Sequence, residues 1–174
     1  PNLMRFVREK TGIAASEKEL VVSPDSEELF TCPAVYMNGH GNVAFTDREA
    51  STLRRWLAGG GFLIADDNYG MDKSFRREMK KVFPDADFVL LPKDHPVSRA
   101  FFPLPGGLPK VHEHDGEPAQ AYGLFHEGRM AVFYSFQADM GDGWEDASVH
   151  NDPEAVRTEA LKMGANLIVW ALSR

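Results

Sequence analysis

Two polar loops in this sequence carry side chains that can bind or transform a ligand. The first reads Asn38-Gly39-His40-Gly41-Asn42, and the second reads Asp66-Asp67-Asn68-Tyr69-Gly70. Each follows an apolar run that is typical of a buried parallel strand. Because ligands bind beyond the carboxyl ends of such strands, we expect both loops to border one site.

The second loop offers carboxylates for catalysis. A carboxylate here can act as a general base, as a metal ligand or as the acceptor for a sugar hydroxyl. Neighbouring residues of a strand point in opposite directions, so at most one of Asp66 and Asp67 faces the site directly. We take Asp67 as the candidate base, and His40 as a second candidate base or oxyanion donor. The structural alternatives are that Asp67 caps the next helix and that His40 serves only the packing.

A third polar group reads His112-Glu113-His114-Asp115. In an extended segment His112 and His114 share a face, as a metal-binding pair requires, so both are candidate ligands of a divalent metal. No third ligand is adjacent. Further candidates lie in the later Asp-rich stretch: Asp139, Asp142, Asp146, His150 and Asp152. The alternative is a set of hydrogen-bonded polar residues that line a pocket without metal.

The expected ligand site combines these groups. Its binding residues are expected to be Asn38, Gly39, Gly41, Asn42, Asp66, Asn68, Tyr69, His112, His114, Asp115, Asp139 and Trp144. Trp144 stands among acidic residues and suits stacking on a sugar ring, although packing is the alternative for a single Trp.

The first loop also matches a dinucleotide fingerprint, because residues 39–44 read Gly-x-Gly-x-x-Ala. However, Thr46 and Glu49 form a Thr-x-x-Glu capping box, which starts the helix after the whole motif. Asp47 would also place a negative charge where pyrophosphate should bind. We therefore expect neither nicotinamide nor flavin. The glycines then serve a tight turn, or their N–H groups face another anion or carbonyl.

Hydrophobic spacing, caps and turn residues predict the elements that hold these loops. Helices are expected over residues 2–10, from Thr46 to Gly59, from Asp72 to Pro84, and from the Asp152-Pro153 pair onward. Strands are expected over residues 19–22, 34–38, 62–65 and 88–91, with a candidate extended segment over 110–114. Residues 122–125 and 130–136 are typical of a β-hairpin around Glu127-Gly128.

This alternation predicts an α/β fold with a mainly parallel central sheet, completed by the hairpin and a closing helix. We expect a single domain over residues 1–174. The net charge of -7 argues against a nucleic-acid partner and against adsorption to an anionic membrane. No apolar run approaches 18 residues, so we expect no direct membrane insertion. The single cysteine, Cys32, precludes an internal disulfide.

Several stretches together resemble one bacterial family. They are residues 36–42, 59–70, 75–79, Asp94-His95-Pro96, 108–115 and 142–146. The chain resembles, over nearly its whole length, the family catalogued as domain of unknown function 4159. That family is similar in layout to the class I glutamine-amidotransferase-like fold, near its trehalose-utilisation branch.

The resemblance implies a flavodoxin-like three-layer sandwich but no reaction. The amidotransferase nucleophile would follow residues 62–65, where this chain has Asp66, Asp67 and Asn68 and no Cys, so glutaminase activity is not expected. The resemblance also suggests a cell-envelope or periplasmic location, with the cytoplasm as the alternative, and a family strand that precedes the first helix and is missing here.

Three hypotheses follow for the function. The first is a domain that binds a small polar ligand, with carbohydrate as a candidate, at the carboxyl ends of the parallel strands. The second is a metal-assisted hydrolase that acts on a sugar or related ester. The third is a non-catalytic interaction domain of a cell-envelope assembly.

Overall fold

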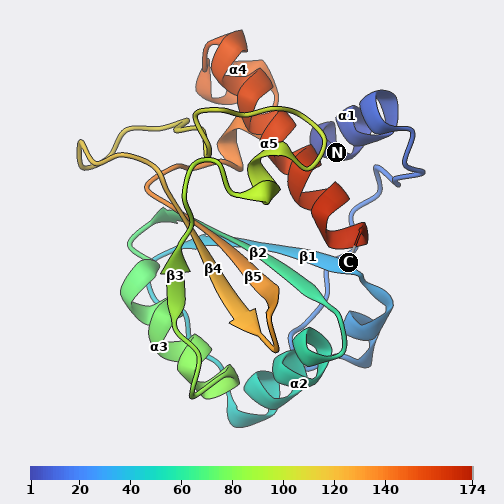
Figure 1. Cartoon of the computed structure of the whole chain (residues 1–174), viewed down its shortest axis with the longest axis vertical. Coiled ribbons are helices and arrows are strands. Elements are labelled where there is room, and N and C mark those ends of the chain that lie inside the picture. Colours follow the sequence, from blue (N-terminus) through green and yellow to red (C-terminus); the bar gives the residue numbers. More distant parts are fainter. Residues whose placement is uncertain (174) are drawn as a thin grey trace.

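The computed structural model describes residues 1–173, which form a mixed α/β fold around a five-stranded sheet (Figure 1). The strands are β1 (Ala34–His40), β2 (Phe62–Tyr69), β3 (Phe88–Leu90), β4 (Gln120–His126) and β5 (Arg129–Phe136). Their order in the sheet is β1-β2-β5-β4-β3. β1, β2 and β5 pair in parallel, whereas β4 is antiparallel to both of its neighbours. The hairpin therefore enters the sheet beside β2, and β3 lies at the far edge.

Helices cover both faces of this sheet. They are α1 (Asn2–Thr11), α2 (Asp47–Ala58), α3 (Asp72–Val82), α4 (Ala147–His150) and α5 (Glu154–Leu172). The 3-10 helices are η1 (Glu27–Thr31), η2 (Pro96–Arg99) and η3 (Asp142–Trp144). α2 and α3 lie on one face, and α1 and α5 lie on the other (Figure 1). Among the described helices, none has the length and apolar character needed to cross a membrane.

Local signals define α2 and the hairpin as expected. The Thr46 hydroxyl accepts from the Glu49 N–H at 3.2 Å, and the Glu49 carboxylate accepts from the Thr46 N–H at 2.7 Å. This capping box is confirmed, and it starts α2 after the Gly-rich motif. Glu127 and Gly128 turn the hairpin with φ values of 49° and 79°.

A buried glutamate ties α3 to the segment before α2. The Glu78 carboxylate accepts from the Phe45 N–H at 2.8 Å and pairs with Lys81 at 2.6 Å and Arg77 at 2.8 Å. Burial alone would raise the pKa of Glu78. These partners outweigh burial and lower its pKa to about 2, so the carboxylate fixes the packing of the two helices as an anion.

The structure differs from the predicted secondary structure in several places. Residues 19–22 form no strand, because Leu20 and Val21 point into solvent with 57% and 89% exposure. Residues 110–114 are bent at both histidines rather than extended. α4 was not predicted, and the last helix, predicted from the Asp152-Pro153 pair onward, begins at Glu154 with Pro153 as its N-cap. The largest difference lies in β2, which continues through the polar residues to Tyr69.

Candidate functional site

Asp66 is a buried anchor of the site. It is fully buried and accepts from the Ser135 hydroxyl at 2.5 Å, the Tyr36 hydroxyl at 3.0 Å and the Gly141 N–H at 2.7 Å. Burial raises the pKa of Asp66 to about 6, although these hydrogen bonds oppose the rise. The carboxylate thus joins β1, β2 and β5 to the loop that follows β5.

Asp67 occupies the amino end of α3. Its carboxylate accepts from the backbone N–H groups of Tyr69, Met71 and Asp72 at 2.9, 2.9 and 3.0 Å, and from the Tyr134 hydroxyl at 3.3 Å. These N–H groups are the ones that would otherwise meet an anion at a helix start. These contacts agree with the capping alternative of the sequence analysis, while Asp67 also lines the cavity described below; its role as a base stays a prediction.

The Gly-rich loop is bound to its neighbours through its backbone. The Gly41 N–H donates to the Tyr69 carbonyl at 3.2 Å. Ser74 donates to the Gly41 carbonyl at 3.2 Å and accepts from the Val43 N–H at 2.9 Å. Asn42 accepts from Arg77, while the side chains of Asn38 and His40 are exposed. The five residues 38–42 do not line the cavity described next.

A cavity of about 280 Å³ lies at the carboxyl ends of β2 and β5. It is lined by Asp67, Tyr69, Gly70, Asp72, Lys73, His114, Asp115, Phe136 and Gln137. The Tyr69 and His114 rings lie 4.8 Å apart, and Asp115 accepts from the Tyr69 hydroxyl at 3.2 Å and from the Gln137 amide at 2.9 Å. The Gln137 Oε1 atom is buried and has no hydrogen-bond partner among the described residues.

Backbone strain gathers around this cavity. Among the described non-glycine residues with positive φ, Tyr69 (151°), Gln137 (60°), Asp139 (49°) and Asn151 (59°) lie in or beside the site. Such conformations cost about 1–3 kcal/mol each and are common where a site must hold a side chain in a set direction. Tyr69 and Gln137 also line the cavity, so part of this strain lies in the cavity wall itself.

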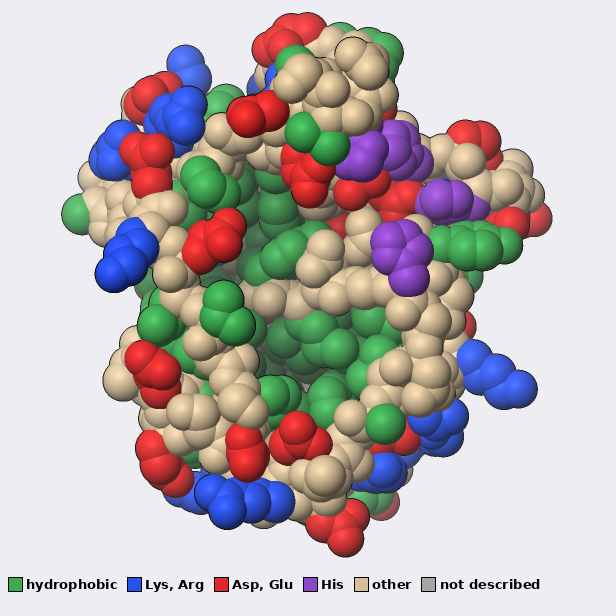
Figure 2. All heavy atoms as spheres, turned by 180° about the vertical axis from the view of Figure 1, so that it is seen from behind, with side chains coloured by type: hydrophobic (Ala, Val, Ile, Leu, Met, Phe, Trp, Pro, Cys, Tyr) green, Lys and Arg blue, Asp and Glu red, His purple; other side chains and the backbone are tan. Residues whose placement is uncertain are grey.

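Beside the cavity lies what we call the histidine cluster: His112, His114, His150, Asp139, Asp142 and Asp152. Figure 2 shows histidine side chains gathered beside acidic ones at one rim of the molecule. His112 Nδ1 lies 2.8 Å from Asp142 Oδ2, and His112 Nε2 lies 3.2 Å from Asp152 Oδ1.

Asp139 connects the cluster with the cavity. Its Oδ2 atom forms an ion pair with the ring of His114, which lines the cavity, and lies 3.9 Å from His112 Nδ1. Asp139 is 1% exposed, and burial raises its pKa while the hydrogen bond from His114 lowers it. The cavity and the cluster are therefore neighbours on either side of one buried carboxylate.

The structure brings only some of the expected residues together. Tyr69, His114 and Asp115 line the cavity, and Asp139 and His112 lie next to it. Lys73, Phe136 and Gln137 also line it and were not singled out from the sequence, where no local pattern marks them. Trp144 lies elsewhere: its ring packs on Tyr36 at 4.9 Å and its N–H donates to the Ala160 carbonyl at 2.9 Å.

Comparison with known families gives one match. A family model with the description "Domain of unknown function (DUF4159)" matches residues 1–172. No curated protein matches the chain.

Proposed function

Because the chain belongs to the family described as Domain of unknown function (DUF4159), a description that names no activity, we propose its function from the site itself. The proposed function is the binding of a small polar ligand, with carbohydrate as the leading class, in the cavity beside Tyr69 and Gln137. The observation that carries this proposal is the unpartnered, buried Gln137 Oε1 in the lining of that cavity.

The chemistry of the lining favours a ligand rich in hydroxyl groups. Gln137 Oε1 needs a donor, since a buried carbonyl oxygen without one costs about 1–3 kcal/mol. The carboxylate of Asp115 can accept further hydrogen bonds, while the Phe136 ring offers an apolar surface to the face of a sugar. A volume of about 280 Å³ lies at the lower end of ligand pockets, which span about 300–1,000 Å³, so the ligand is small.

Thermal denaturation tests this proposal. Glucose, mannose, galactose and sorbitol are added at increasing concentration to protein kept in a chelator, so that metal plays no part. A ligand at 100 times its Kd should stabilise the native state by about 2.7 kcal/mol. Gln137→Leu should abolish the rise in Tm. Asn42→Ala, outside the cavity, is the control that should keep it. The proposal fails if no compound raises Tm or if Gln137→Leu keeps the full rise.

The second candidate is a metal-assisted hydrolase that acts on a sugar or related ester. It is favoured by one observation, which is that Asp139 contacts both cavity-lining His114 and His112 of the histidine cluster. A metal-bound water could then reach a ligand in the cavity. Release of nitrophenol from nitrophenyl acetate and nitrophenyl glycosides, with and without added Zn²⁺, tests this candidate. Metal-independent or absent release removes it.

We propose that the chain has the flavodoxin-like arrangement of the class I glutamine-amidotransferase-like proteins, which its parallel β1, β2 and β5 and its two helical layers support. The position after Ala65 holds the buried Asp66 rather than a Cys. An experimental structure compared with that fold would test the assignment.

A further inference from the structure

His112 contacts a different carboxylate with each ring nitrogen, an arrangement that the polar-ligand cavity does not explain. One ring nitrogen lies 2.8 Å from a carboxylate oxygen of Asp142, and the other lies 3.2 Å from one of Asp152. A neutral imidazole donates one N–H and offers a lone pair on its other nitrogen, so it can bind a metal ion with one nitrogen while it donates to a carboxylate with the other.

Two carboxylate oxygens of the cluster lack hydrogen-bond partners in the described part of the chain. Asp139 Oδ1 and Asp152 Oδ2 are buried and have no hydrogen-bond partner among the described residues, and the side chains of these aspartates are 1% and 9% exposed. Within residues 1–173, the ion pairs of Asp139, Asp142 and Asp152 involve histidines only, with no Lys or Arg. Three acidic groups therefore meet at one place without a permanent positive partner.

The spacing of the donor atoms fits a small metal ion. His112, Asp142 and His150 each offer one ligand atom, and these atoms lie within 4.8 Å of one another. Metal–nitrogen bonds of about 2.0–2.1 Å in tetrahedral geometry set neighbouring ligand atoms about 3.3 Å apart. The contacts of Asp142 Oδ2, at 2.8 Å to His112 and 3.8 Å to His150, lie on either side of that value.

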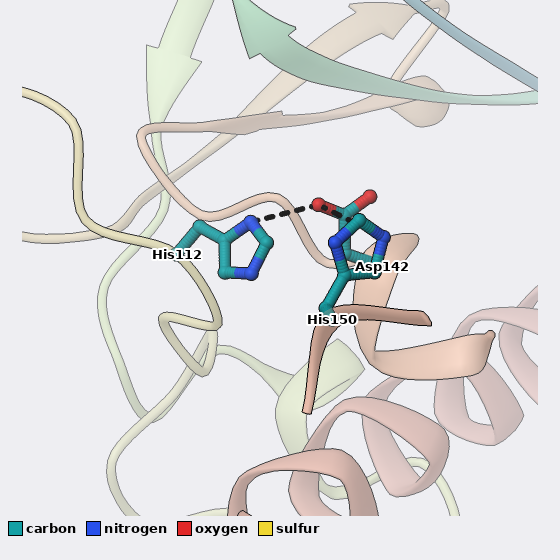
Figure 3. Close-up of side chains that lie close together, drawn as sticks. All are labelled: His112, Asp142 and His150. Carbon is teal, nitrogen blue, oxygen red and sulfur yellow. Dashed lines mark ion pairs between the residues drawn. The ribbon is translucent and has the colours of Figure 1, made fainter. Parts of the chain in front are cut away.

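We propose that His112, Asp142 and His150 form a binding site for one divalent transition-metal ion of the zinc class. In Figure 3 the two imidazoles approach the Asp142 carboxylate from different segments of the chain. Two imidazoles with one carboxylate select zinc, cobalt, nickel or iron over magnesium and calcium, which prefer oxygen ligands. Three protein ligands leave a position open, as in catalytic rather than structural zinc sites.

The surroundings hold two of the ligands in place. Asp152 accepts at His112 Nε2, which leaves the Nδ1 lone pair directed toward Asp142, the arrangement of a carboxylate–histidine–metal triad. The Asn68 amide donates to Asp142 Oδ1 at 3.3 Å, so that the other oxygen faces the histidines. Glu145 Oε2 lies 3.0 Å from His150 Nε2, and metal binding replaces this contact.

Calorimetric titration of untagged protein, dialysed against a chelator and then freed of it, tests the site. ZnCl₂ should bind with one ion per chain, and MgCl₂ in excess should not compete. Co²⁺ should give the intense visible absorption of a four-coordinate ion with nitrogen ligands. His112→Ala and His150→Ala should each remove the binding, and Asp152→Asn should weaken it by about 10- to 100-fold.

The control is His126→Ala, because His126 stacks on Phe83 at the opposite end of the sheet from the cluster. It should bind Zn²⁺ as the native chain does. The side chains of His112 and His150 are 29% and 30% exposed, so neither replacement removes a core side chain. The proposal is overturned if Zn²⁺ does not bind, or if it binds equally well to His150→Ala. The sugar titration in chelator is independent of this result, so either idea can fail alone.

Discussion

Asp66 shows how one buried acid can make the stability of the molecule depend on pH. Burial raises the pKa of Asp66 from 3.8 to about 6. Between these values the native state binds more protons than the unfolded state, so stability falls as pH rises. The stabilisation that comes from protonated Asp66 is fully present below the pKa of the unfolded state, 3.8, and is lost as pH rises through about 6. A shift of about two units corresponds to about 3 kcal/mol.

We therefore predict that Asp66→Asn removes this part of the pH dependence. Urea unfolding in chelator at pH 4 and pH 7 should show the native chain losing up to about 3 kcal/mol relative to Asp66→Asn across that interval. Asp87→Asn, with a side chain 81% exposed, is the surface control. A difference between Asp66→Asn and the native chain that is equal at both pH values would contradict the prediction.

At the scale of elements, the loop between β5 and α4 depends on glycine at position 141. A Cβ atom there would lie 2.0 Å from the Tyr36 hydroxyl and 3.2 Å from Asp66 Oδ2. Gly141→Ala should push Tyr36 away from Asp66 and destabilise the chain by about 1–3 kcal/mol, the usual cost of overpacking. It should also weaken Zn²⁺ binding, because Asp142 follows directly. Chemical denaturation and calorimetry measure the two effects.

Two further variants test whether the clash with the Tyr36 hydroxyl, rather than the replacement of glycine by alanine in general, destabilises Gly141→Ala. Gly106→Ala should be nearly neutral, since a Cβ there meets no atom within 4 Å and φ is not positive. Removing the Tyr36 hydroxyl takes away the atom that the added methyl group would strike. Tyr36→Phe combined with Gly141→Ala should thus cost less than the sum of the two single changes. Strict additivity would show that the clash is not the cause.

Elements were predictable where their signals were local. The capping box of Thr46 and the Glu127-Gly128 turn lie within a few residues of the structure they determine, and both were confirmed. The sequence predicts β2 only over residues 62–65, because the polar residues Asp66 to Asn68 are typical of a loop, whereas the strand extends to Tyr69. The groups that let Asp66 enter the sheet, such as Ser135 and Gly141, come from about 70 residues further along the chain.

The candidate site, too, depends on contacts between residues that are distant in the sequence. His112 and His114 were found as a pair by their spacing, yet each pairs at close range with a different carboxylate. The His150 ring lies 4.9 Å from that of His112, although the two lie 38 positions apart in the sequence. No spacing rule in the sequence connects these two segments. The residue types were enough to predict histidine and aspartate as candidate metal ligands. Which of these residues lie together depends on tertiary contacts, which the sequence does not show.

At the scale of the whole molecule, the sheet is the common wall of two apolar cores. Leu57 of α2 is fully buried in the core on one face, and Met163 of α5 is fully buried in the core on the other. Alternate residues of β2 enter each core, with Leu63 in the first and Ile64 in the second. Because one strand contributes to both, loss of either core should unfold the other.

Leu57→Ala and Met163→Ala should therefore each lower the free energy of unfolding by about 2–5 kcal/mol and shift one shared transition. Trp56 reports the α2 face and Trp170 the α5 face. Urea curves of two single-tryptophan variants, in which Trp144 and one of these two are replaced by Phe, should therefore coincide. Leu20→Ala, with a side chain that is 57% exposed, makes the same chemical change as Leu57→Ala and should cost little. If Met163→Ala moved the Trp170 curve and left the Trp56 curve in place, the two faces would unfold separately and the sheet would not couple them.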